Sequence, residues 1–284
     1  GQDSVVVCDL SLLKDTVDLP FSFFLKDFQI IKLDNRDEAM VGENNLCVSE
    51  NYILVYGSVY ELHPCRLFTK KGEFVANIGA IGQGPGEYRA VYKAEIDEKH
   101  NCIYLMPFDN SNAIYVYDLA GKPLRSIPLH QSVSKAVFKV DADKRELTVG
   151  ALPFTGYPFV AWVQDFEGHL LDSVPAARHL SVLPDYSNEV MYGANTEVFD
   201  LYISTFFELR PDTLYHYIRS ESRLKPRFTL NIGDRKRSIT TFYELPQAYV
   251  GRLMVEEQVG DGMWETKSPS NFIVDKASLR GTFF

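Results

Sequence analysis

The stretch CRLFTKKGEFVANIG, residues 65–79, reads as a strand, a tight turn that ends in Gly72, and a second strand. Glycine suits that turn because a tight hairpin needs a residue at positive φ. The pattern recurs at residues 114–129 and 160–175, in a degenerate copy at 213–233 and in a last copy at 271–284. The expected turn glycines of the later copies are Gly121, Gly168 and Gly281.

This recurrence predicts a β-propeller. A period of roughly 50 residues with four strand-like segments is typical of propeller blades. In the second repeat the expected strands are residues 92–96, 101–106, 113–117 and 123–129. A sandwich would also contain many strands, but it would not repeat them so regularly. Helical patterns are scarce, and the best candidate for a helix is Leu245–Val255.

Composition indicates a folded and acidic protein. The chain has 284 residues, 45% of them hydrophobic, and a formal net charge of −9. An acidic surface repels phosphate backbones, so nucleic acid is excluded as a partner. The four cysteines form no CxxC pair. Cys47 and Cys65 fall on the first and third strands of one blade, about 9–10 Å apart, and are expected to be free thiols.

A resemblance to a known family adds to this interpretation. The motif IGAIGQGPGEY (78–88), with FQIIKL (28–33) and NAIYVYDLAGK (112–122), resembles the signature of six-bladed, NHL-like β-propellers. These are known mostly as exported lipoproteins of Gram-negative gut bacteria and are largely uncharacterised. The resemblance covers most of residues 28–284. It implies a location in the periplasm or on a lipid anchor at the outer membrane, and it adds little chemistry.

The expected domain organisation is an N-terminal tether over residues 1–25 and a propeller over residues 26–284. Family members carry a lipid-modified cysteine at the start of the mature chain. Gly1-Gln2-Asp3-Ser4 would suit the residues that follow such a cysteine, so an N-terminal lipid anchor is the expected membrane contact. About five repeats are recognisable, which indicates either five blades or a six-bladed design with part of the last blade missing. Phe28–Leu33 is the strand expected to complete the last blade.

The candidate binding residues lie on two loops that a propeller would place at one rim. The set comprises the loop after the first repeat and a turn in the second: Gln83, Glu87, Tyr88, Arg89, Asp109, Asn110 and Asn112. The glycine-rich loop lacks GxxxxGK[ST] and precedes a strand, so a nucleotide site is disfavoured. The histidines show no metal-binding spacing, and most are expected at exposed turns. Calcium at Asp109, Asn110 and Asn112 is the alternative to an ordinary turn.

The sequence therefore predicts an exported, non-enzymatic binding protein that uses the rim or channel of a propeller. The ligand is unknown, with a small molecule, a glycan or a peptide or protein partner as candidates. No catalytic residue and no cofactor is assigned. One alternative is an NHL-like, metal-dependent lactonase, lyase or esterase. The other is a structural interaction module of a cell-envelope complex.

Overall fold

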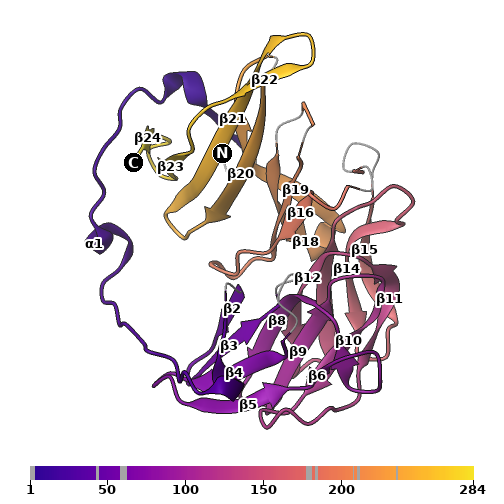
Figure 1. The fold of residues 1–284 in the computed structure, drawn as a ribbon. Coiled ribbons are helices and arrows are strands. Elements are labelled where there is room, and N and C mark those ends of the chain that lie inside the picture. Colours follow the sequence, from indigo (N-terminus) through magenta and orange to yellow (C-terminus); the bar gives the residue numbers. More distant parts are fainter. Residues whose placement is uncertain are drawn as a thin grey trace. The chain divides into compact units, whose positions relative to one another are not determined.

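The computed structural model describes residues 4–42, 45–57, 63–176, 181–182, 185–206, 208–209, 212–234 and 236–284 (Figure 1). Residues 1–3, on which the lipid-anchor prediction rests, lie outside the described residues. The chain divides into two compact units, which are described separately. Unit 1 comprises Gly1–Asp27, Leu152–Ala161 and Ser173–Phe284, and unit 2 comprises Phe28–Ala151 and Trp162–Asp172.

Unit 2 contains two four-stranded antiparallel sheets whose strands follow the order of the chain. The first has β2 (Asn45–Val48), β3 (Tyr52–Tyr56), β4 (Cys65–Thr69) and β5 (Phe74–Ile78). The second has β8 (Val91–Asp97), β9 (Cys102–Pro107), β10 (Ser111–Tyr117) and β11 (Ile127–Val133). Between the two sheets, β6 (Ala80–Ile81) pairs in parallel with β7 (Glu87–Tyr88). A short helical turn, η2 (Asp37–Ala39), precedes the first sheet.

Turn chemistry explains these hairpins. Gly72 and Gly121 lie at φ +88° and +86°, a region that other residues reach only with strain. The Asp118 carboxylate accepts hydrogen bonds from the backbone N–H groups of Ala120 (3.0 Å) and Lys122 (2.9 Å). This confirms that Asp118 starts the turn, as its position in the sequence predicts.

A core of strand side chains joins the two sheets of unit 2. Its fully buried members include Leu54, Leu67, Ile103 and Leu105, each 0% exposed. Burying a leucine or isoleucine contributes about 1.5–3 kcal/mol, so these positions dominate the stability of the unit. Cys65 belongs to the same core, and Cys47 and Cys65 are free thiols, as predicted; Cys8 and Cys102 are free as well.

A third sheet has the order β12 (Ala136–Asp141), β13 (Glu146–Ala151), β14 (Phe159–Asp165) and β15 (Leu170–Pro175). Its last hairpin turns at Gly168, which lies at φ +91° as the repeat requires.

Unit 1 contains two five-stranded sheets. The first is built from β16 (Glu189–Met191), β17 (Asp200–Ser204), β18 (Thr213–Ile218), β19 (Arg223–Asn231) and β1 (Val6–Asp9). The second is built from β20 (Lys236–Glu244), β21 (Ala248–Gly260), β22 (Met263–Thr266), β23 (Ser270–Asp275) and β24 (Gly281–Phe283). The helical segments of unit 1 are short: α1 (Phe21–Phe24), η1 (Leu10–Leu12) and η3 (Arg219–Glu221).

Aromatic side chains dominate the core of unit 1. Phe228 stacks on Tyr249 with ring centroids 4.3 Å apart, and Phe242 meets the edge of Phe228 at 5.2 Å. Such pairs add about 0.5–1.5 kcal/mol beyond the area that they bury. The prediction of an all-β fold is confirmed, since three of the sheets are four-stranded and antiparallel, the size of a propeller blade, and the two sheets of unit 1 each have five strands. Within the described part of the chain, no helix is long and apolar enough to cross a bilayer.

Three sequence predictions are wrong. Leu245–Val255 is not a helix, because most of it lies in β21, between β20 and β23, which satisfy its backbone hydrogen bonds on both sides. The strand predicted at 123–129 starts at Ile127, because Pro123 has no N–H and forms only an isolated bridge with Tyr117. Phe28–Leu33 forms no strand, whereas β1, within the expected tether, pairs in parallel with β19.

The last predicted turn glycine is also misplaced. Gly281 opens β24, and the positive φ of that turn, +54°, belongs to Leu279. The Asp275 carboxylate supports the turn by accepting a hydrogen bond from the Ser278 N–H at 2.6 Å.

Candidate functional site

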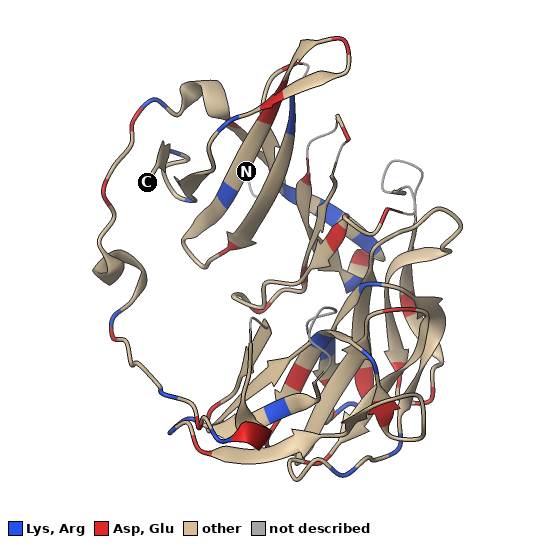
Figure 2. Cartoon of the chain, viewed as in Figure 1, with Lys and Arg blue, Asp and Glu red and all other residues tan. Residues whose placement is uncertain are grey.

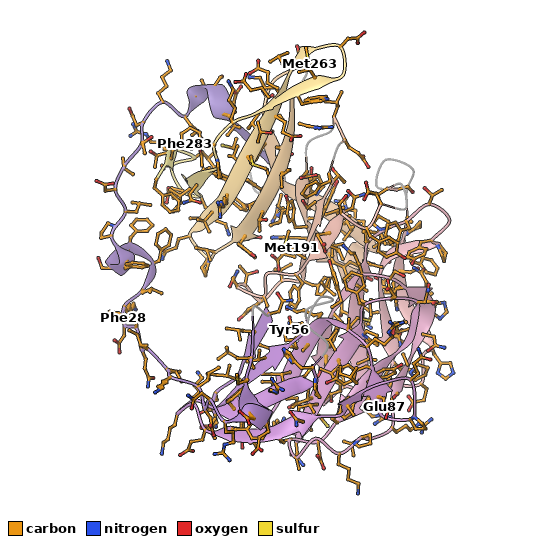
Figure 3. The ribbon with its side chains drawn as sticks, in the orientation of Figure 1. Phe28, Tyr56, Glu87, Met191, Met263 and Phe283 are labelled. Atoms are coloured by element: carbon orange, nitrogen blue, oxygen red, sulfur yellow. The ribbon has the colours of Figure 1, made fainter. Side chains whose placement is uncertain are left out.

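The glycine-rich loop closes on itself through Glu87 (labelled in Figure 3). The Glu87 Oε2 atom accepts a hydrogen bond from the Gly84 N–H at 2.8 Å, and the Glu87 N–H donates to the Gly84 carbonyl at 3.1 Å. A Cβ atom at Gly82 would lie 1.9 Å from the Glu87 Oε2 atom, so any side chain at this position would displace the Glu87 carboxylate. The loop is therefore a preformed structure rather than an open connection.

Tyr88 anchors the end of this loop to the first sheet of unit 2. Its hydroxyl donates to the Ile78 carbonyl at 2.5 Å and accepts from the Cys65 N–H at 2.7 Å. Burial raises the pKa of Tyr88 well above its usual value. Tyr117 meets Tyr88 edge to face at 6.1 Å, and its hydroxyl donates to the Gly86 carbonyl at 3.2 Å. Tyr88 thus holds the loop in place, and its hydroxyl is not offered to a ligand.

The turn after β9 forms a second wall and is fixed from both sides. The Phe108 N–H donates to the Ala90 carbonyl at 3.0 Å, and the Lys135 N–H donates to the Phe108 carbonyl at 3.0 Å. The Asn110 N–H donates to the Ser134 hydroxyl at 3.1 Å. Lys135 is 1% exposed, and its ammonium group lies 5.3 Å from the centre of the Phe108 ring. A cation over an aromatic face contributes about 0.5–2 kcal/mol.

These two walls enclose a hollow of about 510 Å³, here called the Arg89 hollow. Its volume lies within the roughly 300–1,000 Å³ of ligand pockets in general. Among its lining residues are five of the seven predicted binding residues: Gln83, Glu87, Tyr88, Arg89 and Asp109. Asn110 and Asn112 do not line it, because Asn110 turns the chain at φ +44° and Asn112 lies exposed on β10.

The polar side chains of the Arg89 hollow are open to a ligand. Gln83, Arg89 and Asp109 are exposed, and no hydrogen bond or ion pair joins their side chains to any described residue. Lys and Arg positions are interspersed with Asp and Glu positions along the chain (Figure 2). One cation, one carboxylate and one amide can together hold a ligand that has both acceptors and N–H or O–H donors. They contain no activated nucleophile.

A second hollow of about 390 Å³, here called the Leu124 hollow, adjoins the first. It shares three lining residues with the Arg89 hollow: Gly84, Glu87 and Tyr115. The rest of its lining is largely apolar and includes Pro85, Val116, Tyr117, Pro123 and Leu124. Sequence reasoning missed Tyr115 as a site residue. The strand that carries Tyr115 was predicted. That Tyr115 faces the glycine-rich loop depends on how the two segments pack, which the sequence of the strand does not show.

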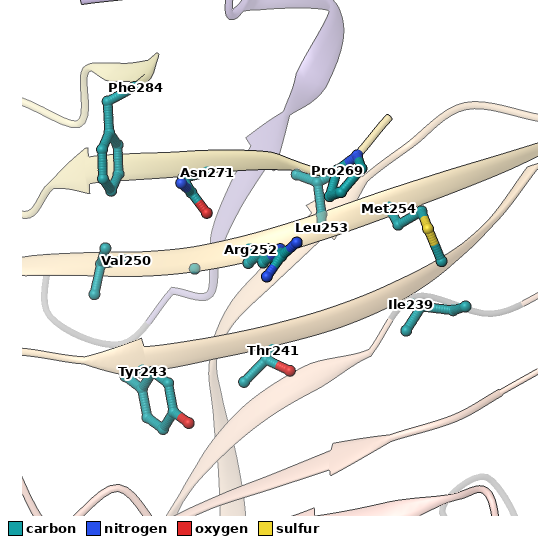
Figure 4. A pocket seen from close by; sticks show the side chains of 11 residues that line it. Ile239, Thr241, Tyr243, Val250, Arg252, Leu253, Met254, Pro269, Asn271 and Phe284 are labelled. Carbon is teal, nitrogen blue, oxygen red and sulfur yellow. The ribbon is translucent and has the colours of Figure 1, made fainter. Parts of the chain in front are cut away.

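Unit 1 has a hollow of about 630 Å³ over β20, β21 and β23 (Figure 4). Ile239, Tyr243, Val250 and Met254 give it an apolar wall, and Arg252 is the one charged residue among its lining residues. Its lining is more apolar than that of the Arg89 hollow, although it includes Thr241 and Asn271, so it is the weaker candidate for a specific site.

Unit 1 also contains a buried ionisable cluster that the sequence did not indicate. His216 lies on β18 and is 7% exposed, so it is an exception to the expectation that most histidines lie at exposed turns. Its ring hydrogen-bonds Glu244 on β20. Over the described residues, no group of three or more His, Cys, Asp or Glu side chains is arranged to hold a metal ion.

Comparisons with known proteins identify a family and a fold. The profile of the family described as "Domain of unknown function (DUF4934)" matches residues 5–267. The fold is similar to that of a Bacteroides fragilis protein described as a "Putative exported protein", with a TM-score of 0.64, 16% identity, and coverage of 99% of this chain and 80% of that one. A periplasmic gluconolactonase of Pseudomonas aeruginosa is also similar, with a TM-score of 0.45, 11% identity, and coverage of 86% and 72%. No curated protein sequence matches this chain.

Proposed function

This chain belongs to the DUF4934 family, and we propose that it is an exported, non-enzymatic binding protein of six-bladed propeller design whose ligand occupies the Arg89 hollow. The repeats and the motif at residues 78–88 support the propeller design. Export is supported by that motif and by the description of the similar Bacteroides fragilis protein.

One observation carries the assignment of the site. Gln83, Arg89 and Asp109 come from two different loops, line one hollow and have no side-chain partner among the described residues. The loops that carry them are already fixed by Tyr88, Glu87 and Lys135. A preorganised wall with unused hydrogen-bonding groups loses little conformational entropy when a ligand binds, which favours affinity.

A thermal-shift screen tests this proposal. The wild-type chain is heated with a panel of glycans, short peptides and small carboxylates, and a ligand of the folded state raises the melting temperature. We expect Arg89→Gln and Asp109→Asn each to reduce the shift caused by any ligand found. Arg280→Gln is the matched control, because Arg280 is exposed and lies outside the hollow. Shifts that persist in the Arg89→Gln/Asp109→Asn double variant would place the ligand elsewhere and refute the assignment.

A further inference from the structure

The Arg89 and Leu124 hollows share a wall, so one extended ligand can occupy both. Gly84, Glu87 and Tyr115 line the two hollows together. We infer that this groove binds the carboxyl-terminal end of a peptide, with the terminal carboxylate at Arg89 and an apolar side chain in the Leu124 hollow. This inference rests on the proposed function and names the class of its ligand.

The guanidinium of Arg89 has no side-chain partner among the described residues and is available to an anionic group of a ligand. Its five N–H donors form a fork that matches a carboxylate, and paired N–H···O bonds to a carboxylate are among the strongest hydrogen bonds in proteins. Among the described residues, neither Asp109 nor Glu87 forms an ion pair with Arg89, although both line the same hollow. The charge of Arg89 is therefore left for the ligand.

The two carboxylates of the hollow can accept hydrogen bonds from N–H donors on the ligand. Asp109 is exposed and has no side-chain partner among the described residues, and Glu87 uses only its Oε2 atom, in the hydrogen bond from Gly84. The Glu87 Oε1 atom is thus free to accept. A peptide supplies a backbone N–H at each residue, close to its terminal carboxylate. One molecule then offers both the acceptor that Arg89 needs and the donors that Asp109 and Glu87 need.

The Leu124 hollow favours a peptide over a glycan. Its lining includes Pro85, Pro123 and Leu124, and the Tyr117 hydroxyl is already used by the Gly86 carbonyl. Ser126 is the one aliphatic hydroxyl in that lining. Besides Ser126, only Glu87 and Tyr115 bring further side-chain oxygens to this lining. A sugar ring has more hydroxyl groups than these can pair, and an unpaired buried polar group costs about 1–3 kcal/mol. An apolar side chain loses no hydrogen bond on entering the hollow.

Calorimetric titration with defined probes tests the inference. The probes are Gly-Leu-Leu, its carboxyl-terminal amide, Gly-Gly-Gly and maltotriose. We expect Gly-Leu-Leu to bind, and its amide to bind at least about tenfold more weakly, because a charge-assisted hydrogen bond is lost. Arg89→Gln should weaken the free acid to the level of the amide and leave the amide unchanged. Leu124→Asp should weaken Gly-Leu-Leu but not Gly-Gly-Gly. Leu171→Asp is the matched control, since Leu171 is similarly exposed and lies outside both hollows.

Three results would overturn the inference. The first is equal affinity for the free acid and its amide. The second is binding of maltotriose without binding of any peptide. The third is no binding of either leucine peptide at millimolar concentration. If maltotriose binds and no peptide does, only the peptide assignment fails and the proposed function stands. The same holds if another ligand from the thermal-shift screen depends on Arg89.

Discussion

The His216 Nε2 atom donates a hydrogen bond to the Glu244 Oε2 atom at 2.5 Å, between two buried side chains of unit 1. Lys276 donates to the other carboxylate oxygen, Oε1, at 2.6 Å. Arg227 donates from its Nε atom to the His216 Nδ1 atom at 3.2 Å. The Nδ1 atom therefore accepts, which leaves Nε2 as the donor to Glu244. Both oxygens of the buried carboxylate are thus satisfied.

Replacing Glu244 by glutamine should destabilise the protein at neutral pH. Burial favours the neutral carboxyl, but the hydrogen bonds from His216 and Lys276 outweigh it and lower the pKa of Glu244 below its usual value. A lowered carboxyl pKa stabilises the fold above the unfolded pKa, and that stability is lost as pH falls through the folded pKa. We expect Glu244→Gln to cost about 3 kcal/mol at pH 7, because it breaks a buried pair.

Urea unfolding between pH 3 and pH 7 measures this cost. The difference between the variant and the wild type should shrink as the pH falls through the lowered pKa of Glu244, because the carboxyl is then protonated in the folded wild type as well. Glu265→Gln is the control, because Glu265 is exposed and lies 4.0 Å from Lys267, its one ion-pair partner. Equal free energies of unfolding for the two variants at pH 7 would contradict the assigned role of Glu244.

Glu95 on β8 should give the opposite pH dependence. Burial raises the pKa of Glu95 to about 7, against the hydrogen bond that its Oε2 atom accepts from the Val140 N–H at 3.2 Å. A raised carboxyl pKa means that the folded state holds a proton that the unfolded state has released between about pH 4.5 and 7. Stability from this group is therefore present below about pH 4.5 and is lost as pH rises to 7.

Glu95→Gln removes the loss of stability at higher pH, because glutamine does not ionise. It also keeps a side-chain oxygen that can accept the hydrogen bond from the Val140 N–H. The variant should exceed the wild type in free energy of unfolding at pH 8 by on the order of 3 kcal/mol, and the gain should fade towards pH 4.5. Denaturant titrations at five pH values would follow this trend. A gain that does not vary with pH would mean that the titration of Glu95 is not its cause.

How far the sequence could predict the structure depends on the range of the interactions. Gly72, Gly121 and Gly168 revealed the hairpins because a positive φ is a local demand that glycine alone meets without strain. Leu245–Val255 was assigned wrongly because its strand depends on hydrogen bonds to β20 and β23. Nothing within that segment specifies those partners.

The same distinction applies to the candidate site. Position in the repeat indicated the two loops, and five of the seven predicted residues line one hollow. Position in the repeat could not show that the Tyr88 hydroxyl hydrogen-bonds the backbone of Ile78 and Cys65. Nor could it show that His216 hydrogen-bonds Glu244, 28 residues away. These contacts depend on tertiary packing and have no local sequence signal.

Tyr88→Phe should make the wall of the Arg89 hollow more mobile without creating a cavity in the core, because the aromatic ring is kept. The change leaves the Ile78 carbonyl and the Cys65 N–H without their partner, which should cost about 2 kcal/mol. Amide hydrogen exchange over residues 80–90 should become faster. Tyr243→Phe is the control, since the Tyr243 side chain is 41% exposed. Exchange equal to that of the wild type would show that the ring alone fixes the loop.

Gly82 and Glu87 should be energetically coupled. In the wild type, Gly82→Ala places a methyl group 1.9 Å from the Glu87 Oε2 atom and should cost about 2 kcal/mol through overpacking. In a Glu87→Ala background the carboxylate is absent, so the same change should cost less than about 0.5 kcal/mol. Gly82 has no positive φ, so backbone strain does not contribute. A double-mutant cycle by urea unfolding isolates the coupling. If Gly82→Ala is equally costly in both backgrounds, the carboxylate of Glu87 does not close the loop in the way that the structure indicates.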